Sequence, residues 1–288
     1  MPYTFTEVIP ISLFAKGGFR WRLATRGLAP EGWLQFDDAY RTYLAEKHRV
    51  LRAHRADALA FVPGSEEPAA EIADLVAAEL TERELPLPPD RAAQHPLEWS
   101  ARGVQEDLCL LERGAAGWRL TAAAVCFPTR WSPADKIGLG LRAIHDPVPR
   151  YEDIADTVDR FFDRLRPGSL VWRPNWSLVG DDRLRLPVED RQAPTAVLDP
   201  IDELWMRVER QTIRRLVDHP DAAVFTIRVH RWPLIDVLDS VDAGLGEELR
   251  TMPIDVAAYK NIDEWRGHLA TVLENRSRAE RRAERRAE

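Results

Sequence analysis

The sequence predicts an α+β fold in which helices cover one face of an antiparallel sheet. Its first third is rich in helix-forming residues, and its apolar positions recur three and four residues apart. Beyond residue 100 the pattern changes to short apolar runs separated by turn residues, which is typical of strands. The expected order is helices, two strands, helices, three strands and closing helices. This order predicts a five-stranded sheet.

Two helices are expected in the N-terminal third, over residues 31–60 and 66–84. Pro68 suits the first turn of the second helix, and the acidic residues beside it favour a helix start. The stretch LPLPPDRAAQHP, residues 85–96, then contains four prolines and marks the clearest boundary in the chain. Residues 1–90 are therefore expected to form a helical wrap.

The core is expected over residues 100–235. GAAG, residues 114–117, separates the first two strands and indicates a hairpin. A helix over residues 152–165 carries an apolar stripe, with acidic residues at its start and basic residues at its end. The predicted strands cover residues 106–113, 118–127, 169–179, 203–213 and 222–232.

Closing helices are expected over residues 236–275, so that residues 1–275 form a single domain. Residues 276–288, rich in arginine and glutamate, are expected to form a charged tail.

Composition excludes several classes of protein. The 288 residues carry a net charge of -7, which argues against a nucleic-acid partner because such proteins present a basic face. The chain contains no apolar run of about 18 residues and no signal-peptide pattern, so we expect a cytoplasmic protein without a membrane partner. Two cysteines, Cys109 and Cys126, cannot form a disulfide framework and are expected to be reduced and buried.

Nucleotide motifs are absent from the sequence. GLGLRA, residues 138–143, has the spacing of a dinucleotide loop but follows no strand and lies in no βαβ unit. The sequence has no Walker loop and no cysteine cluster for an iron–sulfur centre. Any oxidation of NADPH would therefore require other subunits.

Several longer segments resemble one known family. QEDLCLLER, CFPTRWSPADKIGLGLRAIHDPVP, RPNWSL and RVERQTIRRL, with GWLQFDDAYRTYL near the N-terminus, are similar to the heme-binding subunit of heme-dependent oxidative N-demethylases. The resemblance runs over roughly residues 15 to 265.

This resemblance implies a PAS-type fold of five antiparallel strands, with helices between the second and third strands and a bound heme b. It also implies that the heme activates dioxygen and that a small secondary amine such as dimethylamine is oxidised. Electrons would come from partner reductase subunits that carry the NADPH, FMN and iron–sulfur sites.

His145 is the histidine that the resemblance singles out, because heme PAS domains take their axial ligand from the segment between strands two and three. No other histidine falls in that interval. Pro147 and Pro149 restrict the backbone beside it and favour a fixed orientation. From the residues alone, a lone histidine beside an apolar run is more often a hydrogen-bonded core residue than a ligand. Cys126 is the competing axial ligand.

Heme propionates need cationic partners. The basic residues near the expected pocket are Lys136, Arg142, Arg173, Arg207 and Arg228, of which Arg173 and Arg228 are preferred because both lie on strands expected to line the heme. Each could instead be a surface charge or part of an ion pair in the sheet.

Substrate contacts are expected on the last three strands. Glu209 is the candidate for binding the amine as an ammonium, and Asn175 and His230 are further candidates in the distal pocket. A structural pair of Glu209 with Arg207 or Arg228 is the alternative. Two other functions remain open: a heme PAS gas sensor without turnover, and a family member that has lost heme.

Overall fold

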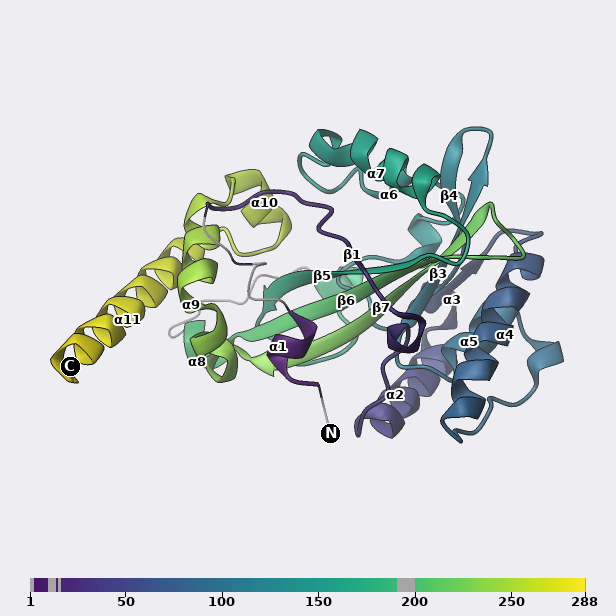
Figure 1. Cartoon of the computed structure of the whole chain (residues 1–288), viewed down its shortest axis with the longest axis horizontal. Coiled ribbons are helices and arrows are strands. Elements are labelled where there is room, and N and C mark those ends of the chain that lie inside the picture. The colour runs from purple at the N-terminus through teal and green to yellow at the C-terminus, as the bar shows by residue number, and fades with distance from the viewer. Residues whose placement is uncertain (1–2, 10–13, 15–16, 191–199, 288) are drawn as a thin grey trace.

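The computed structural model describes residues 3–9, 14, 17–190 and 200–287. At its centre lies a seven-stranded antiparallel sheet with the strand order β1-β5-β6-β7-β3-β4-β2 (Figure 1). The five predicted strands form the middle of this sheet, so the α+β prediction is confirmed. The expected number of five strands is wrong, because two short N-terminal strands pair with the edges. The strands are β1 (Arg26–Gly27), β2 (Leu59–Phe61), β3 (Asp107–Gly114), β4 (Gly117–Ala124), β5 (Leu170–Val179), β6 (Trp205–Arg215) and β7 (Ala222–Pro233).

The β3–β4 hairpin forms at GAAG as predicted, with Gly117 at φ +100°. Strand β4 ends three residues earlier than expected. The backbone N–H groups of Cys126 and Phe127 donate to the Asp107 carboxylate, at 3.0 and 2.7 Å, instead of to a neighbouring strand. The chain therefore leaves the sheet at residue 125.

The helices agree with the sequence pattern except near the N-terminus. The helix expected over residues 31–60 begins only at Tyr40, because Trp33 and Leu34 are buried before it and the Asp37 carboxylate accepts the N–H of Ala39. It also ends early, at Ala53, and residues 59–60 lie in the edge strand β2 instead. The helices are α1 (Phe5–Val8), α2 (Tyr40–Ala53), α3 (Arg55–Ala58), α4 (Glu66–Glu82), α5 (Pro96–Ala101), α6 (Leu141–Ile144), α7 (Glu152–Arg164), α8 (Pro200–Glu203), α9 (Leu234–Thr251), α10 (Ile254–Tyr259) and α11 (Arg266–Ala287).

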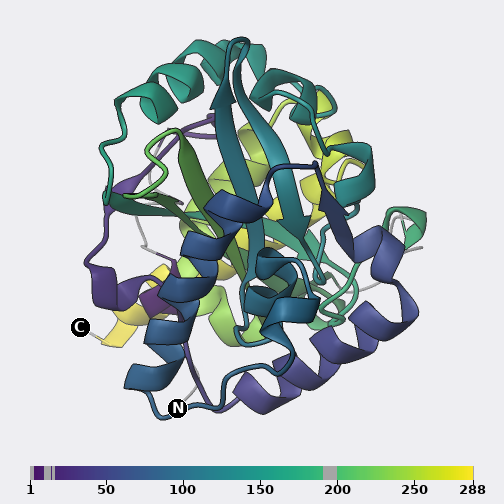
Figure 2. The same cartoon turned by 90° about the vertical axis from the view of Figure 1, so that its right-hand side faces the viewer.

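Helices cover both faces of the sheet, not one as expected (Figures 1 and 2). Neighbouring residues of a strand point to opposite faces. Cys109 packs with Tyr151 and Phe162 beneath α6 and α7, and we call this side the α7 face. Leu108 and Leu110 pack on the opposite side in the cluster that contains α2, α4 and α5, and we call that side the α2 face.

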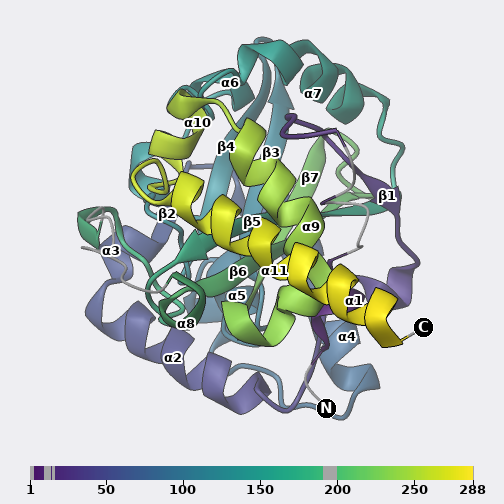
Figure 3. The same ribbon diagram turned by 90° about the vertical axis from the view of Figure 1, so that its left-hand side faces the viewer.

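The C-terminal helices form a third apolar cluster. Helices α9 and α11 pack together and bury residues such as Leu238 and Leu273 with Trp176 of β5 (Figure 3). The expected charged tail continues α11 as one helix to Ala287. None of the helices in the described residues is long and apolar enough to cross a membrane.

Candidate functional site

His145 lies at the C-terminal end of the single-turn helix α6. Its ring nitrogen Nδ1 is 2.7 Å from the carbonyl oxygen of Leu141. A carbonyl only accepts, so Nδ1 carries the proton and the lone pair is on Nε2. Nε2 has no hydrogen-bond partner among the described residues. Burial lowers the pKa of His145, which keeps the imidazole neutral and able to bind a metal.

Neighbouring groups fix the orientation of this imidazole. The ring of Tyr151 stacks on it, with 4.3 Å between the centroids and 6° between the planes. Lys136 Nζ donates to the carbonyl oxygen of Ile144, 2.8 Å away. Trp21 Nε1 donates to the carbonyl oxygen of Pro149 at 2.8 Å, which ties the loop after His145 to residues 18–25, the N-terminal strap.

Glu209 lies on β6 at the centre of a polar network on the α7 face. Its carboxylate accepts hydrogen bonds from Thr129 Oγ1, Asn175 Nδ2 and Gln211 Nε2, at 2.8, 3.2 and 2.9 Å. The described residues place no cation within 4.0 Å of it. The alternative of a direct Glu209–Arg207 ion pair is therefore wrong, because Arg207 donates to Thr129 Oγ1 and to two backbone carbonyls.

Arg173 connects this network to the histidine segment. Its guanidinium donates to Gln211 Oε1 at 2.7 Å and to the carbonyl oxygen of Leu23 at 2.9 Å. Its charge lowers the pKa of His145, and the charge of Glu209 raises the pKa of Arg173 against the effect of burial. His145, Arg173, Asn175 and Glu209 therefore lie within electrostatic reach on one face.

Arg228 and His230 point to the α2 face and are not brought to this site. In the β6–β7 pairing Glu209 stands opposite Val229, so the residues on either side of Val229 face away from Glu209. Arg228 pairs with Asp37 at 3.1 Å, and His230 Nε2 hydrogen-bonds to Gln35 at 2.8 Å. The prediction that Arg173 and Arg228 together bind the propionates of one heme is therefore wrong, because the two side chains lie on opposite faces of the sheet.

Arg142 and Cys126 are also placed away from the site. Arg142 is exposed and pairs with Glu152, Asp156 and Asp159. Cys126 is fully buried in the apolar cluster of the α2 face, and burial raises the pKa of its thiol to about 12. Both cysteines are free and buried, as predicted.

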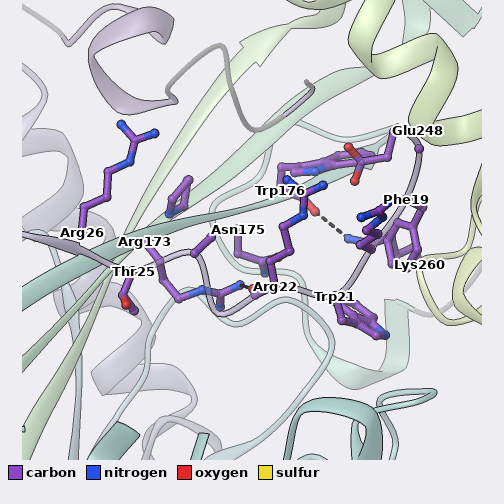
Figure 4. Close-up of a pocket in the computed structure, with 14 residues that line it drawn as sticks. Phe19, Trp21, Arg22, Thr25, Arg26, Arg173, Asn175, Trp176, Glu248 and Lys260 are labelled. Carbon is purple, nitrogen blue, oxygen red and sulfur yellow. Dashed lines mark hydrogen bonds between the residues drawn. The ribbon is translucent and has the colours of Figure 1, made fainter. Parts of the chain in front are cut away.

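A cavity of about 360 Å³ opens beside the edge of β5, next to its short pairing with β1 (Figure 4). Arg173 and Asn175 line it from β5, the N-terminal strap forms another wall, and Glu248 and Lys260 close it. Burial lowers the pKa of Lys260 to about 8 and raises the pKa of Glu248 to about 7. Acidic and basic side chains with pKa values shifted in this way are common at functional sites.

Sequence reasoning missed Glu248, Lys260, Trp21 and Tyr151 as site residues. They come from segments far apart in the chain, so no local spacing links them. One feature of the sequence could have indicated Lys260. The chain has only four lysines among 40 basic residues, and two of them, Lys136 and Lys260, lie in the region of this candidate site.

The residues around His145 fit a heme. The hydroxyl of Tyr151 is buried beside the imidazole without a hydrogen-bond partner, and His145 Nε2 is likewise unpartnered in the described part of the chain. The described residues contain no cluster of three His, Cys, Asp or Glu side chains able to hold a metal ion. A heme iron needs only one or two protein ligands, so a single available histidine suffices.

A comparison with known families identifies the family of this chain. The family model described as "Haem-dependent oxidative N-demethylase, alpha subunit-like" matches residues 24–84 and 77–270. These segments contain the whole central sheet, the His145 loop and the Glu209 network. The chain belongs to the haem-dependent oxidative N-demethylase alpha subunit-like family.

Proposed function

We propose that this chain is the heme-binding catalytic subunit of a cytoplasmic enzyme that oxidatively demethylates a small secondary amine such as dimethylamine. Dioxygen, two electrons and two protons convert the amine to the primary amine, formaldehyde and water. Reductase subunits with NADPH, FMN and iron–sulfur sites supply the electrons. One observation carries this proposal: on the α7 face lie an imidazole and a carboxylate, and among the described residues the imidazole Nε2 has no hydrogen-bond partner and the carboxylate has no cation within 4.0 Å.

A PAS-like architecture of residues 1–275 is part of the proposal. Helices α6 and α7 lie between the second and third of the five central strands, as in the PAS-type fold that the resemblance implies. They also cover the face that carries Glu209. This arrangement supports a heme site between those helices and the sheet.

His145 would hold the heme through Nε2, and the Nδ1–H bond to Leu141 keeps the proton off that atom. A heme bound by one histidine supplies dioxygen activation once it is reduced. Arg173 and Lys136, whose charges act on His145, are the proposed partners of a propionate.

Glu209 would bind the substrate ammonium. Its Oε1 accepts one hydrogen bond and its Oε2 accepts two, which leaves Oε1 with an unused acceptor position. Asn175 and Gln211 hold the carboxylate in one orientation, so little entropy is lost when an ammonium arrives.

Heme reconstitution tests the proposal. The full chain loaded with heme should show a Soret band, bind amine with a spectral shift, and release formaldehyde from dimethylamine when an electron donor and dioxygen are added. A heme protein without turnover would show the band but release no formaldehyde. Absence of heme binding would refute the proposal.

A further inference from the structure

The cavity beside β5 has a surplus of positive charge. Figure 4 shows that Arg22, Arg26 and Arg173 lie around it with Lys260. Glu248 is the one acidic side chain among the described residues that line it. Such a lining favours an anionic ligand, because low-dielectric walls strengthen the field of the cations.

Lys260 is the best-defined cation of this cavity. Its ammonium donates to the carbonyl oxygen of Trp176 at 2.7 Å and lies 4.8 Å from the centre of the indole ring. No carboxylate oxygen lies within 4.0 Å of it among the described residues. An ammonium has three donors, so two remain for a ligand.

Arg22 stands on the facing wall, on the N-terminal strap. Its side chain points toward Trp176 and Glu248 (Figure 4). It too has no ion-pair partner within 4.0 Å in the part of the chain that the structure describes, although its charge acts on Glu248. Lys260 and Arg22 thus place a positive charge on each of two walls of the cavity.

Aromatic side chains supply the apolar part of the lining. Phe19 and Trp21 contact each other edge to face, with 5.1 Å between their ring centres, and Trp176 lies across the cavity from them. A volume of about 360 Å³ is at the small end of ligand pockets. The ligand should therefore be a small acid with an apolar body.

We propose that this cavity is a carboxylate-binding site, in which Lys260 and Arg22 bind the carboxylate of a small organic acid and Trp21 and Trp176 contact its apolar part. Two sources offer this chemistry, a free small acid and a propionate arm of the heme. Only the second source rests on the proposed function.

The charge of Glu248 gives this site a characteristic pH dependence. Glu248 faces Lys260 and Arg22, and Lys260 faces Glu248, Glu209 and Arg173. As pH rises through about 7, Glu248 loses its proton and repels the ligand. As pH rises through about 8, Lys260 loses its charge. Affinity for a carboxylate should therefore fall steadily between these values and above.

Titration of the full heme-free chain with sodium propionate tests the site, with sodium chloride at equal ionic strength as the reference. Tryptophan fluorescence and calorimetry should report saturable binding. Lys260→Met should weaken it by about tenfold, and Glu248→Gln should strengthen it above neutral pH. Arg49→Gln, which removes an exposed cation paired with Glu46 on α2, is the matched control and should bind as the wild type does.

Repeating the titration on the heme-loaded chain separates the two sources. Loss of propionate binding on heme loading assigns the site to a heme propionate, and retained binding assigns it to a free acid. The proposal is overturned if the folded wild type shows no saturable binding, or if Lys260→Met and the wild type bind equally. Because the first titration uses no heme, failure of the His145 assignment would leave its result unaffected.

Discussion

Glu209→Gln is the substitution that tests the proposed substrate site most directly. The carboxylate accepts three hydrogen bonds, from Thr129, Asn175 and Gln211. A glutamine keeps one oxygen, which can accept from Asn175 and Gln211, while its amide group meets the Thr129 hydroxyl. That hydroxyl can rotate to accept, but the charge assistance of all three bonds is lost.

The expected cost follows from these contacts. Hydrogen bonds to a charged group contribute about 1.5 to 3 kcal/mol each, against about 1 kcal/mol for neutral ones. If part of this difference is lost at each contact, the free energy of unfolding should fall by about 2 kcal/mol, or roughly 4 to 8 °C in Tm. Loss of the ammonium partner should weaken amine binding by about tenfold or more.

Spectral titration of the heme-loaded protein with dimethylamine measures the affinity, and urea unfolding measures the stability. Glu106→Gln is the matched control, because Glu106 is a fully buried carboxylate that accepts the N–H of Gln35 on the α2 face. It should leave amine affinity unchanged. Equal amine affinities in wild type and Glu209→Gln would refute the reasoning and leave Glu209 a structural residue of the sheet.

Four further outcomes are expected. His145→Ala should abolish or strongly shift the Soret band of the reconstituted chain, and an unchanged spectrum would eliminate the axial assignment. The isolated chain should oxidise no NADPH in the presence of amine, since it lacks nucleotide and flavin motifs; steady NADPH consumption by the pure polypeptide would contradict this. Because the pKa of Glu248 is about 7 in the folded protein, above its unfolded value, the stability that its proton contributes is lost as pH rises from about 5 to about 8. Urea unfolding of Glu248→Gln should lack this loss, and parallel pH profiles of the two proteins would contradict the assignment. Gly244→Ala should destabilise the protein by about 1 to 3 kcal/mol, since a Cβ there would lie 1.9 Å from the carbonyl oxygen of Phe14, and an unchanged Tm would show that this contact relaxes freely.

Local sequence patterns determined which segments became strands and helices. The two-residue alternation in 203–213 and 222–232 and the apolar stripe of 152–165 each fix one element, because these periods follow from backbone geometry alone. The same alternation correctly placed Arg207, Glu209 and Gln211 on one face of β6. The position of His145 between the second and third central strands also followed from the order of the elements.

Tertiary structure decided which other parts of the chain each face of these strands contacts. Alternation grouped Arg228 with His230, but only the β6–β7 register shows that their face is opposite to that of Glu209. A one-residue change in pairing would have reversed this outcome. The cavity likewise depends on tertiary packing, since Arg22 and Lys260 are far apart in sequence and meet only because the strap and the loop after α10 both pack against the edge of β5. Local periodicity carries no information about such contacts, because they depend on which surfaces the whole chain buries together.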